Sequence, residues 1–196
     1  LIEAGDRLGG LFNSRKFQSY FFDYGTRFVS SSGYQEIDRL LYEDFPSDFW
    51  VELPVLKAGH FFNNVLNSKN RSVDARSLPV DILSRGVYEM LQARESGPCD
   101  DLESYLLNMY GRTFSDHIFR PALETIFEMP LHSLHTSLFK LIFSPRIICL
   151  DSHATREIKK SEFFDQKISY HSYDESPISI PSFYPRSGGV GSWTQN

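Results

Sequence analysis

The sequence has only two cysteines, Cys99 and Cys149, so it carries no disulfide framework. They fall in different predicted elements, and a reducing compartment suits them, so we expect a cytoplasmic protein. No apolar run approaches the roughly 20 residues needed to span a bilayer, and no secretory h-region appears. Because the chain does not begin with methionine, a targeting segment upstream of Leu1 stays open.

Positive charge is also scarce. The chain has 20 Lys and Arg against 25 Asp and Glu, a net charge of -5 and a pI near 5.7. Phosphate backbones are bound by clustered cations, and the one loose group, Lys69, Arg71 and Arg76, is typical of a solvated turn. We therefore expect no nucleic-acid partner.

Several catalytic signatures are missing. The sequence has no G-x-G-x-x-G, no Walker phosphate loop and no G-x-S-x-G nucleophile elbow. His132-x-x-His135, followed by Cys149 and His153, offers four possible metal ligands, but the spacing matches no zinc pattern. We expect no metal site and predict that His132 and His135 cap or pack a helix.

What the chain does contain is a globular composition, with 41% hydrophobic and 23% charged residues. Its length suits one ordinary core or two small ones. The 17 Phe and 10 Tyr either fill cores or line a concave site for a flat ligand, and composition leaves both alternatives open.

Three glycine-containing stretches stand out. Leu1–Phe12 is typical of a strand that ends in the acid Glu3 and is followed by an arginine and paired glycines. A turn with Asp23, Tyr24 and Gly25 follows at hairpin distance. The segment from Phe183 to Gly191 holds a Tyr-Pro pair and three glycines. Taken singly, each stretch is equally consistent with a simple turn.

Together, the order and spacing of these stretches resemble the FAD-dependent oxidoreductases that include amine oxidases, protoporphyrinogen oxidase, phytoene desaturases and UDP-galactopyranose mutases. Ser187 is an extra residue in the last motif. The resemblance implies an α/β fold, in which a partial Rossmann-like FAD-binding domain carries an inserted substrate domain of strands and helices. The expected domains are residues 1–48 for the FAD-binding part, 49–176 for the insertion, and 177–196 for the return segment.

The resemblance also implies roles for individual residues. Glu3 would bind the adenosine ribose, Arg7 the pyrophosphate, and Gly9 and Gly10 would let the backbone approach the cofactor. A solvated acid and a free surface arginine are the competing interpretations of Glu3 and Arg7. The other positions match turns near the flavin or the substrate: Leu11, Phe12, Gly25, Thr26 and Arg27 for the cofactor, and Tyr184, Gly188 and Gly189 for the substrate. No catalytic residue is assigned.

The function implied by the resemblance is hydride transfer between a small molecule and FAD. A UDP-galactopyranose mutase-like isomerase is one alternative, and a non-catalytic module that binds a partner through helices between Pro79 and Phe143 is another. Because the sequence lacks the glycine-rich phosphate loop, we expect this interior fragment alone to bind little FAD and to be inactive. The oligomeric state is open.

Local patterns predict the elements. We expect a hairpin of residues 11–17 and 20–24, and a helix over 34–42 capped by one of Ser30 to Ser32. Further strands are predicted at 49–56, 59–66, 72–74 and 178–184. Helices are predicted from Pro79, at 100–109, at 114–119 with Thr113 as its cap, at 121–127 and at 130–142. Gly111 should stop or bend its helix, and residues 151–176 should lack regular structure.

Overall fold

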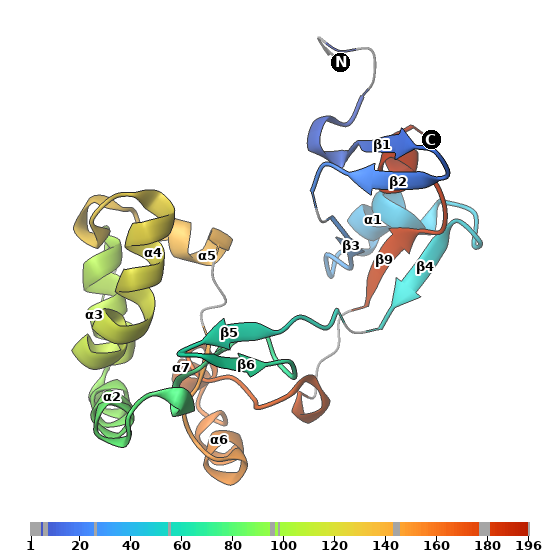
Figure 1. Ribbon diagram of the computed structural model, residues 1–196. Helices are drawn as coiled ribbons and strands as arrows, with labels where there is room; N and C mark the ends of the chain where they lie inside the picture. Colours follow the sequence, from blue (N-terminus) through green and yellow to red (C-terminus); the bar gives the residue numbers. More distant parts are fainter. Residues whose placement is uncertain are drawn as a thin grey trace. The chain divides into compact units, whose positions relative to one another are not determined.

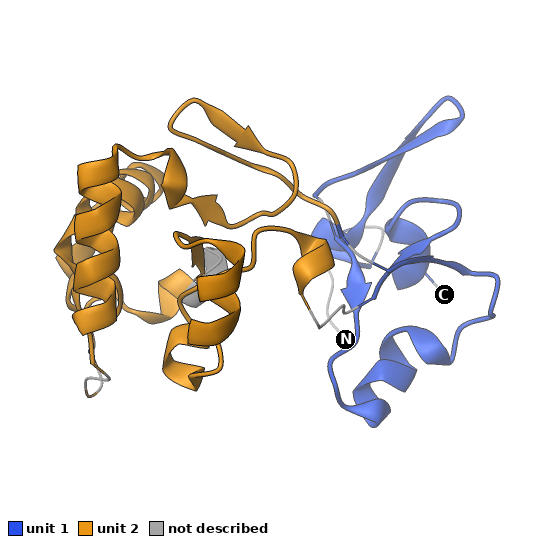
Figure 2. Cartoon of the chain, turned by 90° about the horizontal axis from the view of Figure 1, so that it is seen from below, with its two compact units in different colours: residues 1–56, 177–196 blue, residues 57–176 orange. Residues whose placement is uncertain are grey.

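The computed structural model describes residues 5, 8–25, 27–54, 56–94, 97, 99–142, 146–176 and 181–195. The chain forms two compact units (Figures 1 and 2). Unit 1 comprises residues 1–56 and 177–196, and unit 2 comprises residues 57–176. Unit 2 is therefore an insertion in the sequence of unit 1.

Unit 1 is built from short antiparallel strands. A hairpin is formed by β1 (Ser14–Phe17) and β2 (Tyr20–Asp23), as predicted. A second sheet places β9 (Ser182–Pro185) between β3 (Val29–Ser30) and β4 (Trp50–Leu53). The helical turns of this unit are η1 (Gly10–Phe12), α1 (Gln35–Asp38), the π-helical η2 (Arg39–Glu43) and α8 (Gly191–Thr194).

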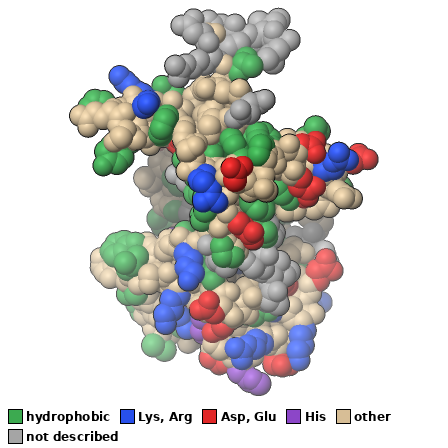
Figure 3. Space-filling model, turned by 90° about the vertical axis from the view of Figure 1, so that its right-hand side faces the viewer, with side chains coloured by type: hydrophobic (Ala, Val, Ile, Leu, Met, Phe, Trp, Pro, Cys, Tyr) green, Lys and Arg blue, Asp and Glu red, His purple; other side chains and the backbone are tan. Residues whose placement is uncertain are grey.

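The hairpin presents its aromatic side chains to solvent. Gln18, at its turn, adopts a positive φ of 55°. Phe17, Tyr20, Phe21 and Phe22 are all exposed. Hydrophobic side chains also reach the surface between charged ones on the face shown in Figure 3. The hairpin of unit 1 therefore exposes a group of aromatic side chains.

The expected serine cap of the first helix is wrong. The helix α1 begins after Tyr34, which offers no side-chain cap. Instead, the hydroxyls of Ser31 and Ser32 donate to the carboxylate of Asp38, at 2.6 and 2.7 Å. These hydrogen bonds, from Ser31 first and then Ser32, lower the pKa of Asp38 to about 2. The serines therefore fix the approach to the helix by binding its last residue.

Unit 2 contains the longer helices. Its strands are the hairpin β5 (His60–Phe62) and β6 (Val65–Asn67), and a parallel pair of β7 (Val73–Asp74) and β8 (Ile147–Ile148). Its helices are η3 (Ala75–Ser77), α2 (Val80–Gln92), α3 (Leu102–Phe114), the π-helical η4 (Ser115–Phe119), α4 (Arg120–Phe127), η5 (Leu131–Ser133), α5 (Ser137–Ile142), α6 (Ser152–Ile158), α7 (Glu162–Asp165) and η6 (Tyr173–Glu175).

A buried hydrophobic cluster holds unit 2 together. The helix predicted from Pro79 is confirmed as α2, in which Met90 is fully buried in this cluster and Leu83 and Val87 pack against it. Val80 and Leu91, which share the predicted apolar spacing, are exposed. The helices α2 and α3 come close at Gly86, where a Cβ would collide with the ring of the fully buried Phe114. A larger residue at Gly86 would therefore push these helices apart.

The bend predicted at Gly111 is confirmed. This glycine adopts φ 76° and ψ 170° inside α3, which L side chains rarely adopt. The cap predicted from Thr113 is wrong, because Thr113 is itself the donor. Its backbone N–H and hydroxyl bind the carboxylate of Glu89 on α2, at 2.7 and 2.8 Å. A side chain from the neighbouring helix thus satisfies the donors that the bend leaves free.

Two further predictions in unit 2 are wrong. Residues 59–66 form most of a hairpin and not one strand, because Asn63 and Asn64 both adopt positive φ, at 48° and 62°. Residues 151–176 contain α6, α7 and η6. The carboxylate of Asp151 caps α6 by accepting the N–H of Ala154 at 2.9 Å, and Ile168 is fully buried.

The two ends of unit 2 are linked by one side chain. The hydroxyl of Tyr173 donates to the carbonyl of Ala58 at 3.0 Å and accepts from the N–H of Ala58 at 3.1 Å. The first and last segments of the insertion therefore meet at a single tyrosine.

The fold is mixed α and β with small sheets. In the described part of the chain, parallel pairing is limited to β7 with β8 and the bridge between Ile147 and Ile168. The strand expected at Leu1–Glu3 lies outside the described residues, so the Rossmann-like sheet stays a prediction. Residues 49–56, expected in the inserted domain, group with unit 1 because β4 pairs with β9 from Trp50 to Leu53.

Candidate functional site

The glycine-containing turns meet at Asp23 in unit 1. Ser14, at the start of β1, donates to Asp23 Oδ1 at 2.6 Å, and the backbone N–H of Val190 donates to the same oxygen at 3.0 Å. The hydroxyl of Tyr184 donates to Asp23 Oδ2 at 2.7 Å. Ser14 Oγ also accepts the N–H of Gly191 at 2.7 Å. One carboxylate thus joins segments about 160 residues apart in sequence.

These contacts set the protonation states of the Asp23 carboxyl group and the Tyr184 phenol. Burial raises the pKa of Asp23, but the hydrogen bonds from Ser14, Tyr184 and Val190 more than offset it, so the pKa lies below its ordinary value. Burial, followed by the hydrogen bond to Asp23, raises the pKa of Tyr184 to about 12. At neutral pH the pair is therefore a carboxylate and a neutral phenol.

Close packing at the turns explains the glycines. A Cβ on Gly191 would lie 2.7 Å from the backbone nitrogen of Ser14, and one on Gly9 would lie 2.7 Å from Thr194 Oγ1. Gly188 and Gly189 adopt φ of 82° and 68°, and a Cβ on Gly189 would collide with the hydroxyl of Ser14. Larger residues at these positions would therefore separate the turns.

An open cleft of about 580 Å³ lies beside this network. Its lining is mostly apolar, and the rings of Phe28 and Tyr184 lie 5.9 Å apart between centroids, tilted by 54° to each other. Two arginines, Arg27 and Arg186, also line it. The full set of lining residues is Asp23, Gly25, Arg27, Phe28, Val51, Leu53, Tyr184, Pro185 and Arg186.

The structure brings most of the predicted site residues into unit 1. Gly25, Arg27 and Tyr184 line the cleft, while Gly188 and Gly189 shape the turn that Asp23 binds. Phe12 packs edge-on against Trp193 at 5.5 Å, and the guanidinium of Arg27 lies 5.8 Å from the Phe12 ring centroid.

The remaining predicted residues divide into two groups. Gly10 has φ 51° and no atom near the position of a Cβ, and Leu11 is exposed. Glu3, Arg7 and Thr26 lie outside the described residues. Their predicted contacts with ribose, pyrophosphate and flavin therefore stay predictions.

Sequence reasoning missed the residues that organise the site. Asp23 was recognised only as part of a turn, and Ser14 and Arg186 were not selected. A signal for Asp23 was available, because a carboxylate at the end of an apolar strand next to a glycine turn needs donors once it is partly buried. Ser14 offered no comparable pattern, since its partner Gly191 is 177 residues away.

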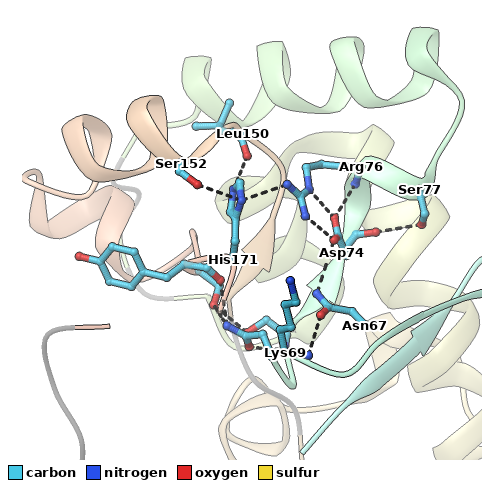
Figure 4. A network of polar contacts seen from close by, with 12 residues as sticks. Asn67, Lys69, Asp74, Arg76, Ser77, Leu150, Ser152 and His171 are labelled. Atoms are coloured by element: carbon cyan, nitrogen blue, oxygen red, sulfur yellow. Dashed lines mark hydrogen bonds and ion pairs between the residues drawn. The ribbon is translucent and has the colours of Figure 1, made fainter. Parts of the chain in front are cut away.

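A second polar network lies in unit 2 (Figure 4). Arg76 forms an ion pair with Asp74 at 2.7 Å and places Nη1 3.0 Å from His171 Nδ1. The other imidazole nitrogen of His171 lies 2.7 Å from the carbonyl of Leu150, so Nε2 carries the proton. Ser152 Oγ lies 3.2 Å from His171 Nδ1 and donates to Glu175 at the same distance.

This network has the residue types of a nucleophilic triad but not its geometry. In a triad, the acid orients the imidazole through the nitrogen that faces away from the serine. Here that nitrogen binds a backbone carbonyl, and Glu175 binds Ser152. The network therefore ties η3 to α6 and η6 and does not prepare a serine nucleophile.

The possible metal ligands do not come together. Within the described ranges, no group of three or more His, Cys, Asp or Glu side chains could hold a metal ion. His135 binds Ser137 through Nδ1 at 2.9 Å, and His132 lies 3.9 Å from Glu103. Burial raises the pKa of Cys149 to about 12, so its thiol stays protonated.

The fold of this chain is similar to part of a known enzyme. The crystal structure of reduced UDP-galactopyranose mutase matches 97% of this chain and 38% of its own, with a TM-score of 0.64 and 17% sequence identity. The present chain thus spans well under half the length of that protein, and the likeness is one of fold. UDP-galactopyranose mutases are also among the enzymes that the glycine motifs resemble.

No protein-family model matches the sequence, and no curated protein matches it. None of the helices in the described residues is both long and apolar enough to cross a membrane.

Proposed function

We propose that this chain is part of an FAD-dependent enzyme. The carrying observation is the convergence of the glycine turns on Asp23, which brings Gly9, Gly189 and the cleft residue Gly25 into one unit. The fold likeness to UDP-galactopyranose mutase supports the same assignment independently of the motifs.

The residues present fit part of an FAD site. Gly10 has no protein atom near the position of a Cβ, so its backbone is open to close approach by a phosphate or flavin. Gly9 and Gly189 pack instead against Thr194 and Ser14 and keep the turns together. We assign Glu3 to the adenosine ribose and Arg7 to the pyrophosphate. Phe12, Gly25 and Arg27 are assigned to the flavin side, together with the neighbouring positions Gly10, Leu11 and Thr26.

The sequence supplies only one portion of such a site. A glycine-rich loop before a helix normally provides the amides that bind the pyrophosphate, and the sequence contains none. The upstream Rossmann-like unit would complete the site, with residues 177–196 closing it and Tyr184, Gly188 and Gly189 facing the substrate.

The leading reaction is hydride transfer from a small-molecule substrate, since the bound flavin would supply the hydride acceptor. Within this chain, the phenol of Tyr184 stays protonated and the carboxylate of Asp23 holds the return turn. Arg27 would favour negative charge developing on a reduced flavin. The structural neighbour favours a second candidate, a flavin-dependent sugar mutase, which would run without net oxidation.

The test begins with the reading frame that encodes this chain. A strand, a G-x-G-x-x-G loop and a helix shortly upstream of Leu1 would support the flavoenzyme, and their absence would support the partner-binding module. The protein expressed from that frame should be yellow after gel filtration, whereas residues 1–196 alone should bind little FAD.

Glycine variants of the protein from the full frame sharpen the test. Gly189→Ala should lower the flavin absorbance per protein several-fold, because its φ is positive and its Cβ would meet Ser14. Gly97→Ala is the matched control, since open space surrounds that glycine. Equal flavin content in both variants, or a colourless full-frame protein, would rule the proposal out.

A further inference from the structure

The cleft in unit 1 carries more positive than negative charge, although the chain has a net charge of -5. Its lining includes two guanidinium groups, from Arg27 and Arg186, and one carboxylate, from Asp23. Both oxygens of that carboxylate already accept hydrogen bonds from within the protein. The lining therefore holds more guanidinium than carboxylate groups, and the one carboxylate is already engaged within the protein.

Arg186 is held in place by backbone atoms. Its Nε donates to the carbonyl of Asp48 at 3.1 Å, and its Nη2 donates to the carbonyl of Trp50 at 3.3 Å. Its own backbone N–H binds the carbonyl of Phe49 at 2.8 Å. Within the part of the chain that the structure describes, no carboxylate forms an ion pair with it. The guanidinium is therefore fixed in orientation by two carbonyls.

The neighbouring strand keeps its acid away from the cleft. Val51 and Leu53 of β4 line the cleft, and because side chains alternate along a strand, Glu52 lies on the opposite face. Phe28, Tyr184 and Pro185 supply the rest of the apolar wall. An apolar wall with a fixed cation at one edge fits a ligand that has an apolar ring and one anionic group.

We infer that this cleft binds an organic carboxylate with a flat apolar body, with Arg186 as the residue that recognises the carboxylate. The inference deepens the proposed function, because it names a substrate class for the same unit. That the bound carboxylate is the substrate rests on the proposed function, whereas its binding does not. Binding itself requires no flavin, so it can be measured independently of the cofactor.

The experiment compares two matched probes on residues 1–196 by isothermal titration calorimetry. These are 2-naphthoate and its neutral isostere 2-naphthamide. Naphthoate should bind about tenfold more tightly than the amide, as a charge-assisted hydrogen bond at an exposed site allows, and added salt should narrow the gap. Equal affinities, or no binding of naphthoate, would overturn the inference.

Variants assign the effect to the residue. Arg186→Gln should abolish the preference for the carboxylate while leaving the affinity for the amide unchanged. Arg15→Gln is the matched control, because Arg15 is an exposed arginine of β1 outside the cleft lining, and it should leave both affinities unchanged. An unchanged preference in Arg186→Gln, or an equal loss in Arg15→Gln, would contradict the assignment.

A second variant covers the possibility that Arg186→Gln unfolds unit 1, which tryptophan fluorescence would reveal. Leu53→Trp fills the cleft from β4 without touching the arginine, and it should weaken both probes together. Retained tight binding in Leu53→Trp would place the probe elsewhere and overturn the inference. Flavin absorbance of the full-frame protein is scored separately, so failure here and failure of the proposed function remain distinct.

Discussion

The two units are stabilised in different ways. In the described part of the chain, every member of the large buried hydrophobic cluster belongs to unit 2. Among the described residues of unit 1, the buried apolar side chains are Val29, Trp50, Pro185 and Val190. Unit 1 is organised instead by the hydrogen bonds to Asp23 and by glycines that pack without room for a side chain. The large buried cluster thus stabilises unit 2, whereas unit 1 relies more on polar contacts, together with ring pairs such as Phe49 with Trp50.

This difference can be measured with two optical signals. Both tryptophans of the sequence, Trp50 and Trp193, lie in unit 1, so their fluorescence reports on that unit. The long helices α2 and α3 lie in unit 2 and dominate the far-ultraviolet circular dichroism. Urea unfolding followed by both signals therefore separates the stabilities of the units.

The largest effect is expected from Phe114→Ala in unit 2. Phe114 is fully buried in the core, and removing a buried phenylalanine ring costs about 3–5 kcal/mol of unfolding free energy. The transition seen by circular dichroism should shift strongly to lower urea, while the fluorescence transition stays in place. Phe61→Ala, at a 66% exposed side chain, is the control and should change little. Identical shifts of both signals would mean that the units unfold together.

Lys167→Met should stabilise unit 2. The ammonium is fully buried, has no hydrogen-bond partner within the described ranges, and lies 3.5 Å from the centroid of the Phe163 ring. Burial lowers the pKa of Lys167 from 10.5 to about 8. Below pH 8 the variant should gain up to about 3 kcal/mol, the upper limit set by that shift.

The pH dependence of the unfolding free energy tests whether the charge of Lys167 destabilises unit 2. Between about pH 8 and 10.5 the unfolded chain holds the proton of Lys167 and the folded chain does not, so wild-type stability should rise with pH. The methionine variant should lack this rise. Lys160→Met, at an exposed lysine paired with Glu157, is the control. A variant less stable than the wild type at pH 7 would contradict the prediction.

Asp23→Asn should weaken unit 1 by about 1–3 kcal/mol, because it disturbs hydrogen bonds from Ser14, Val190 and Tyr184. The folded pKa of Asp23 lies below 3.8, so its contribution is present above that pH and is lost as pH falls through the folded pKa. The variant should lose less stability over this acid range.

The measurement is tryptophan fluorescence in urea at pH 7 and below pH 4. Asp44→Asn is the control, since Asp44 is exposed and its pairing with Arg39 is long at 3.5 Å. A fluorescence midpoint of Asp23→Asn equal to that of the control would remove Asp23 from the centre of unit 1.

Elements with a strong local signal could be predicted from the sequence. The hairpin of β1 and β2, the helix α2 and the bend at Gly111 are confirmed, because each depends on residues a few positions apart. The turn at Asn63 and Asn64 was missed, although paired asparagines tolerate positive φ and so mark a turn. The signal was present in the sequence, and residues 59–66 were wrongly interpreted as one strand.

Other features depend on partners far along the chain. Thr113 binds a carboxylate from α2, and residues 151–176 are held by contacts such as the 2.8 Å hydrogen bond from Asn70 to the carbonyl of Tyr170. Neither leaves a periodic pattern. The same holds for the site, where the motifs identified Gly9, Gly25 and Gly189. They did not identify Ser14, which binds Gly191, or Arg186, which binds the carbonyl of Asp48.

The link between Tyr173 and Ala58 has a consequence for how this chain is assembled from parts. The neighbouring strands β4 and β9 pair from Leu53 to Ser182, so in topology the whole insertion occupies the loop of a β-hairpin. An inserted segment whose two ends are hydrogen-bonded to each other can occupy such a loop without separating the strands. Unit 2 can therefore be replaced as a whole. A short turn in its place would keep the chain continuous and would preserve every strand pair of unit 1.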